Sequence, residues 1–301
     1  MTLRPIRRAD TEALRALWNR AAVHDPLSAP LFDEKVWDDP GFTPDLALAA
    51  DAAGEIAGFA FGVVRPSDDG PRGVIKLLAV APERQREGIG TRLVEALETA
   101  MQAAGATAIR LGESPPNYLS PGLDPRYTRA LLLFEKRGYT RLREAYHMAA
   151  DLAGQTFDTD ADEQALTADG ITVRRAAGSD QETVMTFLDE HWPPWKAEIG
   201  RTFANDPVSL HLAFEGGAVL GFSAYDANNV GTGWFGPMGT APAARGRGVG
   251  AVLLKRCLAD MKAQGHATST IPWVAPIAFY AHHVGAEISR LFYRYEKKLG
   301  G

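Results

Sequence analysis

The sequence has a single cysteine, Cys257, among its 301 residues. One cysteine cannot form an intrachain disulfide, and a zinc site built from several cysteines is excluded as well. The sequence also lacks a run of 18 apolar residues that would span a membrane, and it lacks the apolar stretch of a signal peptide near its start. We therefore expect a protein of the reducing cytoplasm, with no metal site and no membrane association.

A basic surplus is also missing, because the formal net charge is −5. This balance disfavours nucleic acid as a partner, since nucleic-acid binders carry basic patches. Hydrophobic residues make up 46% of the chain and charged residues 23%, which is typical of a folded globular protein. The length predicts about two domains.

Acidic residues are concentrated in one short segment. Residues 151–169 contain six acidic side chains, no basic one and few large apolar side chains. This composition is typical of a solvated connector between domains. We therefore predict an N-terminal domain over 1–150, an acidic linker over 151–169 and a C-terminal domain over 170–301.

The two predicted domains share a degenerate repeat. Short motifs recur in the same order, at offsets that shrink slowly from 167 to 160 positions: 6–9 with 173–176, 58–61 with 221–224, and 81–90 with 241–250. A repeat of this length indicates a duplicated fold, not a solenoid. Periodicity and turn residues predict the same elements in each half: a strand, a helix, a hairpin, a strand, a glycine-rich turn, a long helix, a strand, a second helix and an antiparallel pair.

This element order predicts an α/β unit with a mixed sheet in each half. The ranges are strands 3–8 and 171–175, helices 11–22 and from 179, hairpin turns at 53–54 and 216–217, strands 74–80 and 234–240, and helices 92–104 and 252–264. Gly105 and Gly265 are expected to end the long helices. Pro237 lies inside a strand, so it is expected at a bulge or on an unpaired side.

Each glycine-rich turn lies between a strand and a helix, where glycines let backbone N–H groups surround an anion. The turns run over residues 85–91 and 245–251, and the second carries Arg245 and Arg247, which suit a pyrophosphate. Residues 246–251 also match the G-x-G-x-x-A dinucleotide fingerprint formally. We reject that interpretation because residues 242–245 separate the strand from the first glycine and no acidic residue follows about twenty positions on.

Both turns match R/Q-x-x-G-x-G/A, the acyl-CoA-binding signature of the GNAT superfamily of N-acetyltransferases. The resemblance covers about residues 3–149 and 170–299, and the two-domain plan is similar to that of the mycothiol synthases. It implies two tandem GNAT domains that bind acetyl-CoA or another acyl-CoA. The residues that it implies for cofactor binding are Leu78, Ala79, Val80, Gln85, Arg86, Glu87, Gly88, Ile89, Gly90 and Thr91, with Met238, Gly239, Thr240, Arg245, Gly246, Arg247, Gly248, Val249, Gly250 and Ala251.

The resemblance also implies a proton donor on the second helix, where the family commonly has a tyrosine that protonates the departing thiolate. The matching residues are Tyr280 in the second half and Phe134 in the first, and phenylalanine cannot donate a proton. The position where the family often has asparagine holds Tyr127 or Trp273. Residues 114–122 form an insertion in the first half, expected to alter or block its site.

Other candidate site residues are less specific. Aromatic walls suit a ring or an aliphatic chain, so we expect substrate contacts from Trp192, Trp195, Trp234, Trp273 and Asp226. No base can be assigned among Asp226, His211, Glu215, His282 and His283. An acidic stretch with Asp33, Glu34, Asp38 and Asp39 is expected to be solvated, although it would also favour a cationic amine. Cys257 is expected in the core.

The resemblance therefore implies transfer of an acetyl group to a primary amine of a small molecule. We expect the C-terminal domain to be catalytic and the N-terminal domain to be degenerate, in a monomer or homodimer. The alternative is a non-catalytic acyl-CoA-binding or regulatory protein.

Overall fold

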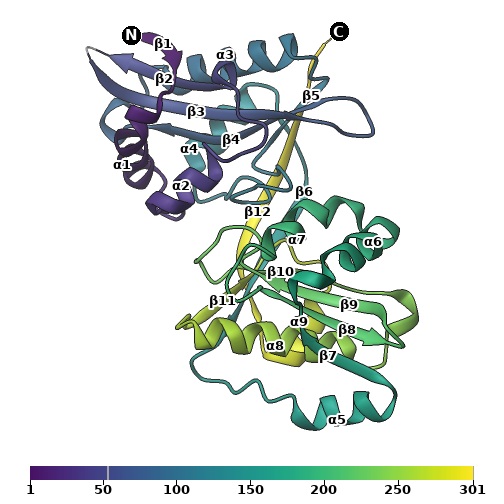
Figure 1. The fold of residues 1–301 in the computed structure, drawn as a ribbon. Coiled ribbons are helices and arrows are strands. Elements are labelled where there is room, and N and C mark those ends of the chain that lie inside the picture. The colour runs from purple at the N-terminus through teal and green to yellow at the C-terminus, as the bar shows by residue number, and fades with distance from the viewer. Residues whose placement is uncertain (53, 301) are drawn as a thin grey trace. The chain divides into compact units, whose positions relative to one another are not determined.

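The computed structural model describes residues 1–52 and 54–300, and the chain divides into two compact units. Unit 1 contains Met1–Ala145 and Leu291–Gly301, and unit 2 contains Tyr146–Arg290. Each unit has strands and helices of its own (Figure 1). Among the described residues, no helix has both the length and the apolar composition needed to cross a membrane.

Unit 1 is a mixed sheet with helices on both faces. Its strands follow the order β1-β2-β3-β4-β5-β12 with β6 next to β12, and among the described pairs from β1 to β12 only β4–β5 is parallel. The strands are β1 (Thr2–Pro5), β2 (Ala47–Ala52), β3 (Glu55–Arg65), β4 (Arg72–Val80), β5 (Ala108–Leu111) and the unit 1 parts of β6 (Thr140–Asp151) and β12 (Glu287–Lys298). The helices are α1 (Thr11–Ala21), α2 (Ala29–Lys35), α3 (Ile89–Ala103) and α4 (Thr128–Lys136).

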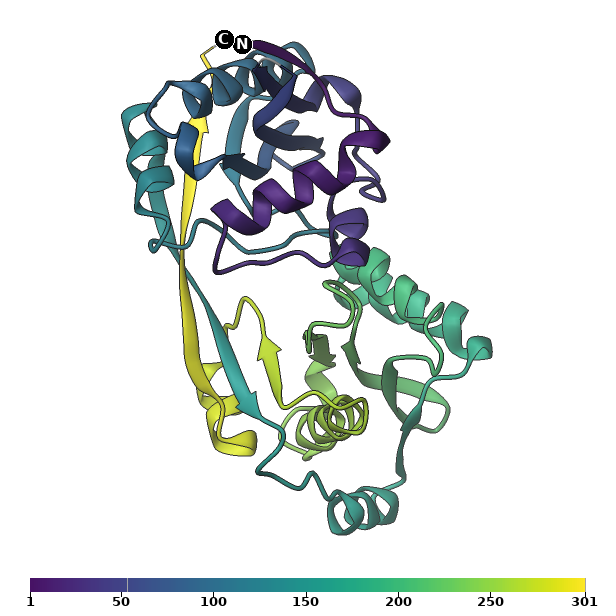
Figure 2. The same ribbon diagram turned by 90° about the vertical axis from the view of Figure 1, so that its left-hand side faces the viewer.

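Helices cover both faces of this sheet (Figures 1 and 2). A separate hydrophobic core lies on each face. The face of α1 that carries Leu14, Leu17 and Trp18 is buried, as the helical spacing predicts. It packs in a core with alternate residues of β3 and β4. On the other side, α3 buries Leu93 and Leu97 against the opposite face of the same strands.

Unit 2 repeats this plan with different strand partners. The strands β7 (Ile171–Arg175), β8 (Leu210–Glu215), β9 (Ala218–Tyr225) and β10 (Phe235–Thr240) form an antiparallel sheet. The strand β11 (Thr268–Ile271) pairs with β6, and a single parallel bridge joins Trp234, just before β10, to Thr270 of β11. The helices are α5 (Asp160–Ala168), α6 (Gln181–His191), α7 (Lys196–Thr202), α8 (Val249–Ala263) and α9 (Ile277–Val284).

The boundaries of the two units differ from the predicted domain boundaries in two places, the acidic segment and the last strand. The predicted acidic linker contains α5, whose Leu166 is buried in a core with Ile171 and Val252. Acidic side chains of α5 pair with α8, with Asp162 2.9 Å from Lys255. The segment is therefore part of unit 2, because its charges have partners there.

The last strand is the other difference. Residues 296–298 of β12 pair with β5 of unit 1, whereas residues 148–151 of β6 pair with β11 of unit 2. Each of these two long strands therefore begins in one unit and ends in the other. Local sequence pattern does not specify such long-range pairing.

Local predictions agree better with the structure. The hairpins β2–β3 and β8–β9 form as predicted, although Ala53 of the first turn lies outside the described residues. Gly105 and Gly265 end α3 and α8 with positive φ angles. The β9–β10 register shifts between Phe235 and Met238, which places Pro237 at a bulge as expected.

Candidate functional site

The glycine-rich turn of unit 1 leads from β4 directly into α3. Gly88 is the N-cap of α3 with φ +80°, and Arg86 shares this left-handed conformation at φ +74°. The first N–H groups of a helix have no partner within the helix, so they are available to an anion. A Cβ added at Gly88 would meet no atom within 4 Å, which shows that the turn is open on this side.

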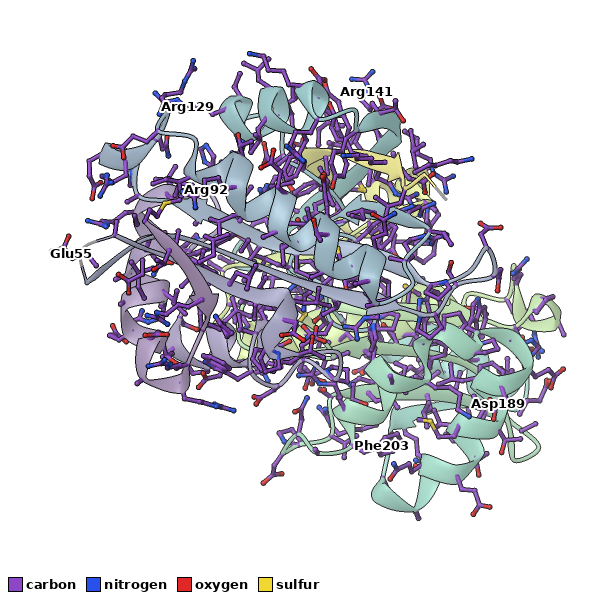
Figure 3. All side chains as sticks on the ribbon, turned by 90° about the horizontal axis from the view of Figure 1, so that it is seen from above. Glu55, Arg92, Arg129, Arg141, Asp189 and Phe203 are labelled. Carbon is purple, nitrogen blue, oxygen red and sulfur yellow. The ribbon has the colours of Figure 1, made fainter. Side chains whose placement is uncertain are left out.

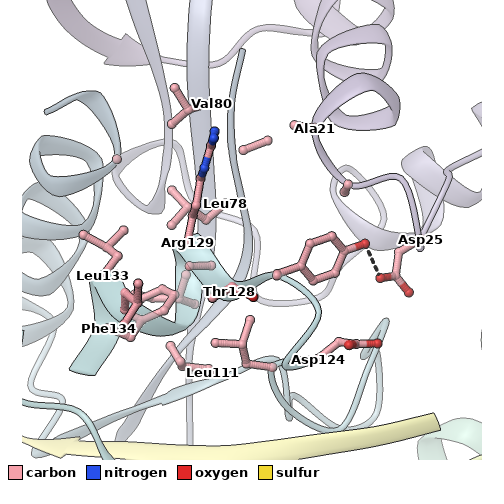
Figure 4. A pocket seen from close by; sticks show the side chains of 18 of the residues that line it. Ala21, Asp25, Leu78, Val80, Leu111, Asp124, Thr128, Arg129, Leu133 and Phe134 are labelled. Atoms are coloured by element: carbon pink, nitrogen blue, oxygen red, sulfur yellow. Dashed lines mark hydrogen bonds between the residues drawn. The ribbon is translucent and has the colours of Figure 1, made fainter. Parts of the chain in front are cut away.

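A cavity of about 740 Å³ adjoins this turn within unit 1 (Figure 4). The predicted cofactor residues that line it are Leu78, Ala79, Val80, Gln85, Arg86, Gly88, Ile89, Gly90 and Thr91. Glu87 is the exception, because its carboxylate pairs with Arg84 on the surface. The volume is within the usual range for small-molecule sites.

The cavity exists because β4 and β5 separate. Their parallel pairing ends at Ile75 and Leu111, and the N–H of Gly112 donates to the carbonyl of Ile75 at 2.9 Å. Beyond this point, β4 residues and α4 form the walls instead (Figure 4). The predicted insertion supplies part of the wall through Leu119 and Ser120 and does not fill the cavity.

Basic side chains lie at the turn end of the cavity. Arg129 of α4 donates to the side chain of Gln85, which in turn donates to the carbonyl of Val80 at 3.2 Å. Figure 3 shows Arg129 among the exposed side chains of unit 1. Arg86 and Lys136 also line the cavity. This arrangement suits the phosphates of a nucleotide cofactor.

Phe134 lines the cavity at the position of the family's proton donor. Its ring is only 3% exposed and meets Tyr139 edge-on at 5.1 Å. The Tyr127 hydroxyl, by contrast, donates to Asp25 at 2.7 Å and accepts from the His24 amide at 3.1 Å (Figure 4). Sequence reasoning missed Asp25, which carries no motif and follows α1 in an irregular loop.

A buried ion cluster also contributes to the cavity, through Lys76 of β4. The ammonium of Lys76 pairs with Asp39, which also accepts from Arg65 at 2.7 and 2.9 Å. The expectation that the acidic stretch is solvated is therefore wrong for the buried Glu34 and for Asp39, which is also buried. Two cations, both distant in sequence, neutralise it.

The turn of unit 2 has the same backbone form. Gly246 and Gly248 have φ angles of +77° and +82°, and Gly248 is the N-cap of α8. Arg247 turns to Glu215, with N–O distances of 2.6 and 3.2 Å, and its guanidinium lowers the pKa of that carboxyl. Arg245 is exposed.

The strand before this turn passes beneath a tryptophan. A Cβ at Gly239 would lie 2.8–3.0 Å from ring atoms of Trp192, so only glycine fits there. Trp192 stacks on Trp195 with ring centres 5.6 Å apart. The other two predicted tryptophans belong to a different group, because Trp234 and the Trp273 amide both contact His147. The four tryptophans therefore do not form one wall.

Two further predicted residues have definite places in unit 2. Asp226 has φ +50°, and its carboxylate accepts from the Gly231 amide at 2.9 Å, as in a loop-stabilising turn. Tyr280 is 7% exposed and its ring contacts Phe279 of α9 and Phe235 of β10 at 5.2 and 6.1 Å. Burial raises the pKa of the Tyr280 phenol, which stays protonated at neutral pH.

Cys257 lies in the core as predicted. It is fully buried, and its thiol donates to the carbonyl of Ser223 at 3.2 Å. Burial raises the pKa of this thiol, so a thiolate nucleophile is disfavoured.

Comparison with known proteins agrees with this geometry. The model of the Acetyltransferase (GNAT) family matches residues 9–123 and 177–285, one region for each turn. The chain belongs to the GNAT family. Its two matched regions make it a tandem GNAT protein, and its relatives support an N-acyltransferase.

One relative extends over most of the chain. The mycothiol acetyltransferase of Nocardia farcinica is 30% identical over 293 residues, which is 88% of this chain and 86% of that protein. A shorter acetyltransferase of Sodalis glossinidius is 34% identical over 113 residues, covering 37% of this chain and 74% of its own.

Solved structures show the same fold at low sequence identity. The glucosamine N-acetyltransferase region of a fungal multi-domain β-N-acetylglucosaminidase superposes with a TM-score of 0.82 at 21% identity. The match covers 98% of this chain but only 38% of that fungal chain. A tandem GNAT protein from the clavulanic acid biosynthesis pathway gives a TM-score of 0.66 at 15% identity, and the match covers 100% of this chain and 99% of that one.

Proposed function

We propose that the protein transfers an acetyl group from acetyl-CoA, or another acyl-CoA, to a primary amine of a small molecule in the cytoplasm. The observation that carries this proposal is the open glycine turn that continues into the gap between β4 and β5 of unit 1. The nine-residue set that lines this gap was proposed from sequence for the same ligand. The relatives named mycothiol acetyltransferase support a small-molecule acceptor.

The residues present fit a coenzyme A ester. Helix N-termini at Gly88 and Gly248 present amides to the diphosphate, and Arg86 or Arg245 adds positive charge. Exposed polar backbone along the open edge of β4 or β10 suits the amides of a pantetheine arm. When bound, the ester supplies an activated thioester for transfer.

We propose that catalysis belongs to unit 2 and that unit 1 is degenerate in that reaction. Tyr280 then protonates the leaving thiolate. Its raised pKa keeps the phenol protonated until the thiolate forms, and the same shift makes it a weaker acid. Phe134 cannot fill this role in unit 1. The acceptor must arrive as, or become, a neutral amine, and we assign no side chain to that deprotonation. Trp192 and Trp195 are the proposed acceptor contacts, because Trp192 lies over Gly239 and Trp195 stacks on Trp192.

The test compares matched variants at the two equivalent positions. Tyr280→Phe is expected to lower kcat about 100-fold, the size of one positioned proton donor, with the affinity for acetyl-CoA unchanged. Phe134→Tyr is the matched control and is expected to leave the rate of CoA release unchanged. Steady-state CoA-thiol release with a panel of primary amines measures both.

The outcomes separate the alternatives. Full activity of Tyr280→Phe, combined with loss of activity on changing Gln85 or Gly88, would assign the reaction to unit 1. Binding of acetyl-CoA without thiol release for any amine would favour a non-catalytic acyl-CoA-binding protein. Absence of binding would contradict the proposal altogether.

A further inference from the structure

Lys76 occupies a bulge at the inner end of the unit 1 cavity. In the β3–β4 register, Phe61 pairs with Leu77 and Gly62 pairs with Ile75, so Lys76 is the extra residue. Bulges redirect a side chain out of the regular alternation of a strand. The Lys76 side chain is 1% exposed, and Lys76 is among the residues that line the cavity.

The surroundings of the amine favour its neutral form more than water does. The ammonium donates to Asp39 and to the carbonyl of Lys35 at 3.0 Å, and it lies 5.2 Å from the ring centre of Phe61. Burial lowers the pKa of Lys76 to about 8, against the opposing effect of Asp39.

The position of Lys76 relative to the gap matters most. The gap between β4 and β5 opens directly after Ile75, whereas the glycine turn adjoins its far end at Val80. These five residues of strand span about 16 Å at about 3.3 Å per residue. A pantetheine arm that starts at the turn and follows β4 therefore places its thioester toward Lys76. This step rests on the proposed function.

We propose that Lys76 is a self-acetylation site, which takes the acetyl group of an acetyl-CoA bound in the unit 1 cavity. Lys76 first gives one proton to Asp39. Its nitrogen then forms a bond to the acetyl carbon while the carbon–sulfur bond breaks. A second nitrogen proton passes to the thiolate, so CoA leaves as the thiol. The product is a neutral amide on Lys76.

This chemistry agrees with the residue at position 134. The nucleophile itself supplies the proton that the thiolate needs, so the step requires no separate acid on α4. The proton taken by Asp39 passes on to solvent, and the carboxylate that this restores keeps Arg65 as its cationic partner. Unit 1 then carries an acetyl group on Lys76 after it has bound acetyl-CoA.

The experiment incubates the full-length native protein with acetyl-CoA and maps its peptides by mass spectrometry. We expect the mass of one acetyl group on Lys76 before any appears on exposed lysines. Lys136 is the internal control, because it is exposed at the same cavity and reports unselective chemical acetylation. Excess CoA should slow the reaction at Lys76 several-fold and leave Lys298, which is exposed and lies outside the cavity lining, unaffected.

Protein unfolded in urea serves as a second control, in which Lys76 should lose its advantage over Lys136. Lys76→Arg should abolish the fast modification, and the wild-type peptide map decides the question even where this variant does not fold. Acetylation of Lys136 ahead of Lys76 would overturn the inference. Binding of acetyl-CoA by calorimetry without modification of Lys76 would overturn it and leave the proposed function standing. No binding at all would contradict both.

Discussion

Asp39 shows what a sequence-based prediction misses at the scale of a residue. The same short stretch of chain also carries Asp33, Glu34 and Asp38, so the local density of acidic residues favours solvent exposure. In the structure, its carboxylate is buried between Arg65 and Lys76, which are 26 and 37 positions away. No motif or periodicity connects these three residues. Tyr280 and the turn glycines could be proposed as site residues because they belong to contiguous motifs.

The buried carboxylate gives a stability prediction. Asp39→Asn keeps the shape of the side chain but leaves two largely buried cations without a counter-charge. Loss of one partner from a buried charge cluster costs about 3 kcal/mol or more. We expect the free energy of unfolding, measured with urea, to fall by about that amount.

Asp33→Asn is the matched control, because Asp33 is half-exposed and its oxygen lies 4.0 Å from Arg8. Exposed pairs of this kind contribute about 0–1 kcal/mol, so this variant should be close to wild type. Equal stability of the two variants would show that the cluster around Asp39 is not a stabilising one.

At the scale of an element, the glycine-rich turns could be predicted in place, between a strand and a long helix, but not in their ends. Both long helices begin at Ile89 and Val249, three residues before the predicted starts. The prediction treated Gly90 and Gly250 as turn residues, because glycine disfavours helix interiors. In the structure they lie in the first helical turn, where small size brings α4 or α9 close: an added Cβ at Gly90 would lie 3.4 Å from Leu133.

Arg86 is the strained position of the unit 1 turn. It has φ +74°, whereas the equivalent residue in unit 2 is glycine at φ +77°. A side chain in this conformation costs about 1 kcal/mol. Arg86→Gly should therefore raise the free energy of unfolding by up to about 1 kcal/mol. The gain is smaller to the extent that glycine increases the conformational entropy of the unfolded chain. If the guanidinium holds a phosphate, the same variant should bind acetyl-CoA about 10-fold more weakly, as one charge-assisted hydrogen bond predicts.

Urea unfolding and calorimetry measure these opposite effects on one variant. The reciprocal change, Gly246→Arg, introduces the same strain in unit 2 and is expected to lower stability by about 1 kcal/mol. Unchanged affinity in Arg86→Gly would show that the Arg86 guanidinium does not hold a phosphate.

At the scale of the whole molecule, the duplicated fold was predictable but the exchange of final strands was not. Repetition of motifs at regular offsets identifies two α/β units, because each motif is local. The last strand would show the same alternating pattern in either sheet, so its sequence does not specify which strand it pairs with. The predicted C-terminal domain, 170–301, would lack residues 148–151 that pair with β11 and would contain a strand end whose partner β5 lies in unit 1.

Truncation after Arg290 tests this assignment. The removed segment contains Tyr295, which is buried in the core with α3 and donates to Glu135 at 2.7 Å, and the residues of β12 that pair with β5. Loss of one large aromatic side chain from a core costs about 3–5 kcal/mol, and the exposed edge of β5 adds to this. Hydrogen exchange should therefore show loss of protection in β4, β5 and α3 of unit 1, while β8, β9 and α8 of unit 2 keep theirs.

A chain that ends at Leu299 keeps all of β12 and should exchange like the full-length protein. Loss of protection confined to unit 2 would instead support the boundaries expected from the repeat, since the last strand would then belong to the C-terminal fold.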